Sequence, residues 1–144
     1  MSYNMFSGTR VYINKQYRVM FNFPNNWKPS EIAKNRFEGS DGFFQVSLIS
    51  SNKSIDEVAK HDAYHSKLPY GRNPEIKKRF VNGHEARLIT PDRGETDFME
   101  KQAAIIVEYD KPLAFNNNKY NYLIIWSDVY NIMGILRSLK ILPV

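Results

Sequence analysis

Apolar and polar residues alternate in several short runs of the chain, a pattern that is typical of half-buried β-strands. The run Tyr17–Phe23 shows it best, because every second residue there is aromatic or valine. The same reasoning predicts further strands over Arg10–Ile13, Arg36–Glu38, Phe43–Ile49, Glu75–Val81, His84–Thr90, Gln102–Tyr109 and Lys119–Trp126. These strands follow one another closely, so we expect hairpins in an antiparallel sheet.

Turn and capping residues divide the runs. Asn82-Gly83 separates two predicted strands, and this pair is preferred in two-residue hairpin turns because both positions take a positive φ angle. Ser54 is followed three residues later by Glu57, which is the capping box of a helix start. We therefore predict a hairpin over 75–90 and a helix over 54–67.

A second helix is predicted over Val129–Leu139, with Ser127 or Asp128 as its cap. At about 100° per residue its apolar side chains share one face. This face consists of Val129, Ile132, Met133, Leu136 and Leu139. It must be buried, most simply against the sheet, so the expected fold class is α+β, with a central antiparallel β-sheet flanked by helices.

Length and composition indicate one domain over residues 1–144, since 42% hydrophobic residues in a chain of this length suffice for one core. The chain has no cysteine, which excludes disulfides, thiolate nucleophiles and cysteine-bound metals. No apolar run approaches the roughly 20 residues of a membrane helix, and no signal peptide is evident. A cytoplasmic location is favoured, unless the chain is a domain of a longer exported protein.

The net charge is +5, but the charges are well mixed along the chain. The basic triplet Lys77–Arg79 has Glu75 and Glu85 nearby in sequence. Weak electrostatic binding of nucleic acid or anionic lipid is therefore one alternative function. The chain contains no Gly-x-Ser-x-Gly elbow, Gly-x-Gly-x-x-Gly motif or phosphate loop, so nothing indicates a serine nucleophile or a nucleotide.

His61, Asp62 and His65 have the spacing of a zinc-protease motif, in which two imidazoles one helical turn apart hold a metal and the acid activates water. The third ligand would have to be His84, the remaining histidine. A metal-dependent hydrolase is thus a second alternative. The ordinary interpretation, that both histidines are exposed at a helix edge, is favoured, and we predict no catalytic residue, metal or cofactor.

Asp62 falls near the middle of the helix face that Ile55, Val58 and Ala59 form. A buried carboxylate without a partner would be unfavourable by several kcal/mol. A tilted helix would leave Asp62 in water, and this interpretation is favoured. The alternative is that Asp62 anchors a neighbouring loop through an arginine or Tyr70.

Exposed aromatic and apolar residues beside a helix end and in a polar loop are typical of protein contact surfaces. The polar segment 91–101 is such a loop, and the end of the first helix carries two tyrosines. The candidate partner-binding residues are Tyr64, His65, Tyr70, Arg93, Phe98 and Met99.

Three stretches resemble the PsbP family and, more broadly, the α/β sandwich that it shares with the Mog-type import factors. They are Phe21–Trp27, a strand ending in Pro-x-x-Trp, Asn82–Ala86 with the hairpin turn, and Ile132–Ile141 with the last helix and a short apolar tail. The resemblance implies a sheet flanked by helices, in a small member of bacterial type. It also implies a non-enzymatic binding or accessory role through protein–protein contacts. No binding residue carries over, and the photosystem and Ran-binding roles do not transfer.

Overall fold

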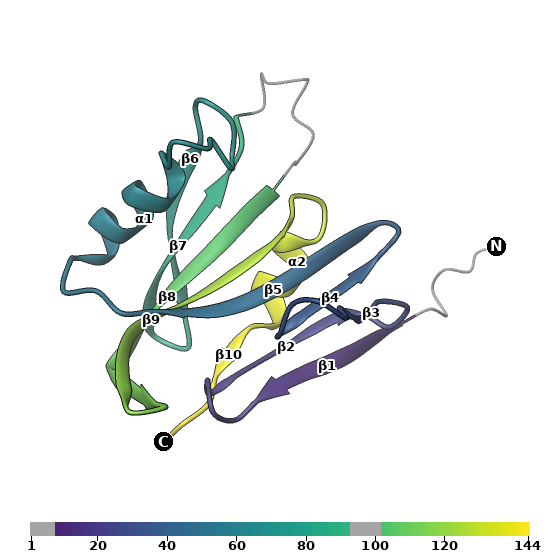
Figure 1. Cartoon of the computed structure of the whole chain (residues 1–144), viewed down its shortest axis with the longest axis horizontal. Coiled ribbons are helices and arrows are strands. Elements are labelled where there is room, and N and C mark those ends of the chain that lie inside the picture. The colour runs from purple at the N-terminus through teal and green to yellow at the C-terminus, as the bar shows by residue number, and fades with distance from the viewer. Residues whose placement is uncertain (1–7, 93–101) are drawn as a thin grey trace.

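The computed structural model describes residues 8–92 and 102–144, which form strands and two short helices (Figure 1). The elements in chain order are β1 (Thr9–Asn14), β2 (Val19–Pro24), β3 (Lys28–Pro29), β4 (Arg36–Gly39), β5 (Gly42–Ile49), α1 (Ile55–Ala63), β6 (Glu75–Val81), β7 (His84–Thr90), β8 (Gln102–Phe115), β9 (Asn118–Asp128), α2 (Ile132–Ser138) and β10 (Lys140–Ile141). Within the described residues, neither helix is long and apolar enough to span a membrane.

The strands form two sheets in which every pairing is antiparallel. The large sheet has the order β3-β4-β5-β9-β8-β7-β6, and the small one has the order β1-β2-β10. Helix α1 packs on one face of the large sheet over β6, β7 and β8, whereas α2 contacts β2, β8 and β9 on the other face (Figure 1). The expected α+β fold with a central antiparallel sheet and flanking helices is confirmed, and a second sheet completes one layer.

Strand β8 separates two apolar cores, because both of its faces are covered. Ala103, Ile105 and Val107 belong to the core on the side of the small sheet and α2. Ala104 and Ile106 belong to the core beneath α1. Successive side chains of a strand point to opposite faces, so the unbroken apolar run of β8 is that of a strand buried on both sides.

Trp27 fills the first core, and two glycines make room for it. Its side chain is fully buried, and its indole Nε1 donates a hydrogen bond of 2.8 Å to Asp41. A Cβ atom on Gly39 would overlap the indole, and one on Gly42 would lie 2.6 Å from it. The β4–β5 hairpin therefore needs glycine on both sides of its turn for Trp27 to reach the core.

Two local predictions are confirmed at atomic detail. Asn82 and Gly83 have φ angles of 52° and 82° between β6 and β7, as the hairpin turn requires. The capping box is formed as well, with Ser54 Oγ accepting from the Glu57 amide and the Glu57 carboxylate accepting from the Ser54 amide.

Both helices are shorter than predicted. Helix α1 ends at Ala63 rather than at Lys67, because the chain folds back in two turns at Leu68 and Gly71, where φ is 51° and 81°. These turns place Tyr70 beneath the helix instead of extending it.

Helix α2 begins at Ile132 rather than at Val129, and its N-cap Asn131 makes no side-chain capping bond. Asp128 Oδ2 does accept from the Asn131 amide at 3.1 Å, so this carboxylate holds the turn before the helix. The predicted apolar face is also shifted. Ile135 is buried in place of Met133, whose side chain is 37% exposed.

Strand β8 is longer than predicted, since it passes Pro112 and ends at Phe115. Its register with β9 shifts between Glu108 and Leu113, and this irregularity accommodates the proline.

Candidate functional site

A groove of about 940 Å³ runs between α1 and β5. It exists because α1 covers β6, β7 and β8 and leaves the neighbouring β9 and β5 partly uncovered. Its walls include Ile49 on β5, Ile124 and Trp126 on β9, and Val58 on α1. Ile49 and Trp126 pack against the core beneath α1 but remain partly exposed. The groove therefore offers an apolar surface open to solvent.

Charged side chains surround this apolar surface, and its two carboxylates are already engaged. Glu57 accepts hydrogen bonds of 3.2 Å from the backbone amide and the hydroxyl of Ser54, and these bonds hold the pKa of Glu57 below its ordinary value. Asp62 accepts a hydrogen bond from the hydroxyl of Tyr70. Both carboxylates are therefore held in place by hydrogen bonds within the protein.

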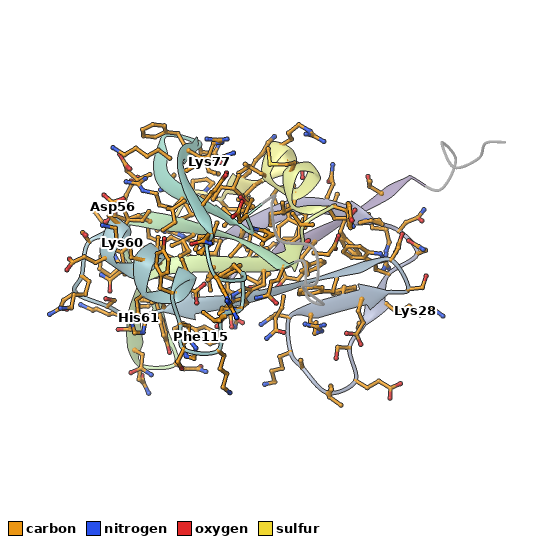
Figure 2. The ribbon with its side chains drawn as sticks, turned by 90° about the horizontal axis from the view of Figure 1, so that it is seen from above. Lys28, Asp56, Lys60, His61, Lys77 and Phe115 are labelled. Atoms are coloured by element: carbon orange, nitrogen blue, oxygen red, sulfur yellow. The ribbon has the colours of Figure 1, made fainter. Side chains whose placement is uncertain are left out.

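The lysines of the groove, Lys53 and Lys60, form no ion pair with any residue in 8–92 or 102–144. Both side chains are exposed. Figure 2 shows Lys60 and His61 on α1, at the opposite end of the molecule from Lys28. The rim of the groove therefore carries two exposed lysines without ion pairs, beside two hydrogen-bonded carboxylates, around an apolar floor.

Tyr70 connects the end of α1 to the floor of the groove. Its side chain is 1% exposed, and its hydroxyl is hydrogen-bonded to Asp62 and to the side chains of Trp126 and Gln102. Burial, reinforced by the charge of Asp62, raises the pKa of Tyr70. The hydroxyl thus stays protonated and fixes Trp126 against the last turn of the helix.

Arg87 fixes the other end of α1. Its side chain is buried on β7, and it donates hydrogen bonds of 2.8 Å to Asp56 in the first turn of α1 and to Glu85. The bond to Arg87 lowers the pKa of Asp56. With Arg87 and Tyr70 at its two ends, the helix is attached to the sheet at a defined distance from β5.

The helical spacing on which the alternative of a zinc site depends does not hold in the structure. His61 is exposed on α1, but α1 ends at Ala63, so His65 is not on the next turn of the same helix. His84 begins β7, where its Nδ1 lies 3.0 Å from the carbonyl oxygen of Glu108. No three His, Asp or Glu side chains of the described part of the chain are placed to hold a metal ion.

The interpretation favoured for Asp62, a carboxylate left in water by helix tilt, is wrong, because Tyr70 donates to it. The alternative, an anchor for the neighbouring loop, is the one that the structure contains. The spacing of residues along the sequence does not show that the segment 64–74 folds back against the helix.

The candidate partner-binding residues lie in different surroundings. Tyr64 lines the groove with 58% of its surface exposed, and His65 is exposed just beyond α1. Tyr70 is buried and supports the groove from within. The remaining candidates, Arg93, Phe98 and Met99, lie outside the described residues.

Sequence reasoning missed the residues that shape the groove. The sequence pattern predicts only a strand at Trp126, and nothing in it indicates that α1 leaves this side chain partly uncovered. Lys53 and Lys60 belong to the mixed charge of the chain, and their lack of partners is visible only in three dimensions.

Comparison with known proteins defines the class of fold. No family model matches the chain, and no curated protein matches it by sequence. Among solved structures, the fold is that of a PsbP-like protein. The chain is similar to the solution structure of cyanobacterial PsbP (CyanoP) from Synechocystis sp. PCC 6803, with a TM-score of 0.55 and 14% identity over 94% of each chain. The predicted PsbP-like fold is confirmed, and the cytoplasmic location stays a prediction.

Proposed function

We propose that this protein is a non-enzymatic binding module whose groove between α1 and β5 holds an acidic, apolar-anchored segment of a protein partner. The observation that carries the proposal is an open apolar floor bordered by two lysines without ion pairs. The PsbP-like fold agrees with an accessory role, and the exposed ring of Tyr64 extends the contact surface at the end of the groove.

The apolar floor supplies the affinity in this proposal. Burying one leucine or phenylalanine side chain contributes about 1.5–3 kcal/mol. The groove volume of about 940 Å³ exceeds what a single such side chain fills, so a segment with two apolar residues fits the space.

The lysines supply the selectivity. Lys53 and Lys60 are exposed, so each attracts an acidic residue with a modest energy that falls with salt. An acidic segment without apolar residues should therefore bind weakly, and an apolar segment with basic flanks should be excluded.

The test uses a fluorescein-labelled peptide in which leucine and phenylalanine are flanked by aspartate and glutamate. Fluorescence anisotropy measures its affinity, and Trp126 emission reports occupation of the floor. Because Lys60→Glu reverses one charge at the rim, we expect about fivefold weaker binding from a surface-pair energy near 1 kcal/mol.

Lys28→Glu is the matched control, since Lys28 is exposed at the far end of the molecule and the change in net charge is the same (Figure 2). Equal weakening by both variants would contradict the groove as the site. Equal binding of an acidic peptide lacking apolar residues, or of heparin, would favour the electrostatic alternative instead.

A second variant tests the floor itself. Ser47 lines the groove and pairs with Ile124 on β9, so its side chain lies on the same face of the sheet. Ser47→Phe should fill part of the groove and abolish peptide binding, whereas Ser47→Ala should leave it unchanged. Retained affinity in the phenylalanine variant would place the peptide elsewhere.

A further inference from the structure

A second hollow of about 420 Å³ lies where the β1–β2 turn, the β6–β7 turn and residues 141–144 meet. Unlike the groove, it has an arginine among its lining residues. The side chains that matter to its chemistry are Arg18, Asn82, His84, Asp110, Lys111 and Leu142.

Arg18 is the unusual member of this set. Its guanidinium lies over the ring of Tyr109, with Cζ 5.2 Å from the ring centroid. Its Nε is buried and has no hydrogen-bond partner, and among the described residues it is the one buried side-chain nitrogen or oxygen in that condition. A buried donor without an acceptor is unfavourable, so such an atom calls for a partner.

The backbone at Arg18 adds to the observation. Its φ angle is 56°, a left-handed conformation that asparagine and glycine adopt more readily than arginine does. The turn alone therefore does not explain the choice of arginine. An arginine held at such a position, in the wall of a cavity, is placed for a ligand.

From this geometry we propose that the hollow is a binding site for a carboxylate attached to a small apolar group. The planar guanidinium of Arg18 matches a carboxylate with two parallel hydrogen bonds. Lys111 adds a second positive charge at the mouth, and Ile141 and Leu142 provide apolar contact for the organic part. The site is separate from the groove between α1 and β5, with which it shares no lining residue.

The charges around the hollow favour a monoanion over a phosphate dianion. Asp110 lies 3.5 Å from Nδ1 of His84 and offsets one of the two cations, Arg18 and Lys111. Of the formal charges of Arg18, Lys111 and Asp110, one net positive charge remains. A single carboxylate neutralises it, whereas a dianion would leave the site with an uncompensated negative charge next to Asp110.

The experiment follows the Nε–H cross-peak of Arg18 in ¹⁵N-edited NMR spectra of the whole chain during titration with 3-methylbutanoate. We expect a saturable shift of this cross-peak at millimolar concentration, with other arginine Nε–H signals unmoved. The alcohol 3-methylbutanol lacks the charge and should produce no such shift. Inorganic phosphate should bind at least tenfold more weakly than the carboxylate.

Two variants complete the test. Arg18→Asn removes the guanidinium while suiting the left-handed backbone, so it should fold and lose binding, as followed on the backbone amides of residues 82–84. Arg137→Asn removes the same charge from the exposed end of α2 and should bind as the parent does. An unshifted Arg18 signal, equal shifts of all arginines, or unchanged binding by Arg18→Asn would overturn the proposal.

Discussion

Replacing Tyr70 by phenylalanine removes one hydroxyl from beneath α1 and leaves the buried ring in place. The hydroxyl donates to Asp62 and is hydrogen-bonded to the side chains of Trp126 and Gln102. The substitution therefore breaks the connection between the helix end and the floor of the groove without creating a large cavity. It tests whether that connection stabilises the α1 layer.

The size of the effect follows from the kind of bond that is lost. A hydrogen bond to a charged group contributes about 1.5–3 kcal/mol, against about 1 kcal/mol for a neutral one. Asp62 is only partly buried, so water replaces part of the lost interaction. We expect Tyr70→Phe to lower the free energy of unfolding by about 2 kcal/mol.

Tyr122→Phe provides the matched control. Tyr122 is 2% exposed in the same core, and its hydroxyl donates to a neutral acceptor, the carbonyl oxygen of Lys53, at 2.6 Å. Urea unfolding, followed by circular dichroism and tryptophan fluorescence, gives both free energies. The control should lose about 1 kcal/mol, half as much as Tyr70→Phe.

A double-mutant cycle isolates the pair. Asp62→Ala combined with Tyr70→Phe should show a coupling energy of at least about 1 kcal/mol, since each single change already removes the bond. If Tyr70→Phe costs no more than Tyr122→Phe, or if the coupling vanishes, the anchoring role of Asp62 is refuted.

Three further expectations follow from other parts of the fold. Gly42→Ala should destabilise the protein by about 3 kcal/mol in thermal melts, because the new methyl would lie 2.6 Å from Trp27, whereas Gly134→Ala, with nothing within 4 Å, should stabilise α2 by about 0.5–1 kcal/mol. Asp56→Asn should cost less than about 1 kcal/mol at neutral pH, and since the folded pKa of Asp56 is lowered from 3.8, the difference from the parent should shrink as the pH falls below that value. Burial raises the pKa of Tyr109 above 10.0 in the folded protein. The stability that depends on the protonated phenol is therefore present below pH 10 and lost as the pH rises further, because the unfolded chain ionises first. Tyr109→Phe should flatten this alkaline decline in Tm.

The opposite results would contradict this reasoning. A neutral Gly42→Ala would mean that the β4–β5 turn moves freely away from Trp27. An effect of Asp56→Asn that persists at pH 2 would show that the bond to Arg87 does not depend on the charge of Asp56. An unchanged alkaline profile in Tyr109→Phe would show that this phenol is not what the high pH ionises.

Local chemistry made much of the fold predictable. Asn82-Gly83 marks its turn because few other pairs adopt two positive φ angles, and Ser54 with Glu57 marks the start of α1 because both side chains complete the first turn. The strands were predictable for the same reason, because the alternation of apolar and polar side chains depends only on neighbouring residues.

The groove was not predictable in this way, because it depends on how far one element covers another. The alternation along β5 and β9 indicates which residues share the face of the sheet that carries α1. It does not indicate that α1 lies over β6 to β8 and leaves Trp126 partly uncovered. The end of α1 was missed for a related reason. The turns at Leu68 and Gly71 return the chain to the helix, where the hydroxyl of Tyr70 donates to Asp62.

The division of β8 between two cores gives the molecule two separate indole reporters. Trp27 lies wholly within the core of the small sheet, and Trp126 borders the core beneath α1. Ile105 and Ile106 are adjacent on β8 and face opposite cores. Replacing either residue by valine therefore disturbs only the core that it faces. The emission of each tryptophan can thus be assigned to one half of the protein, and events in the groove can be followed apart from global unfolding.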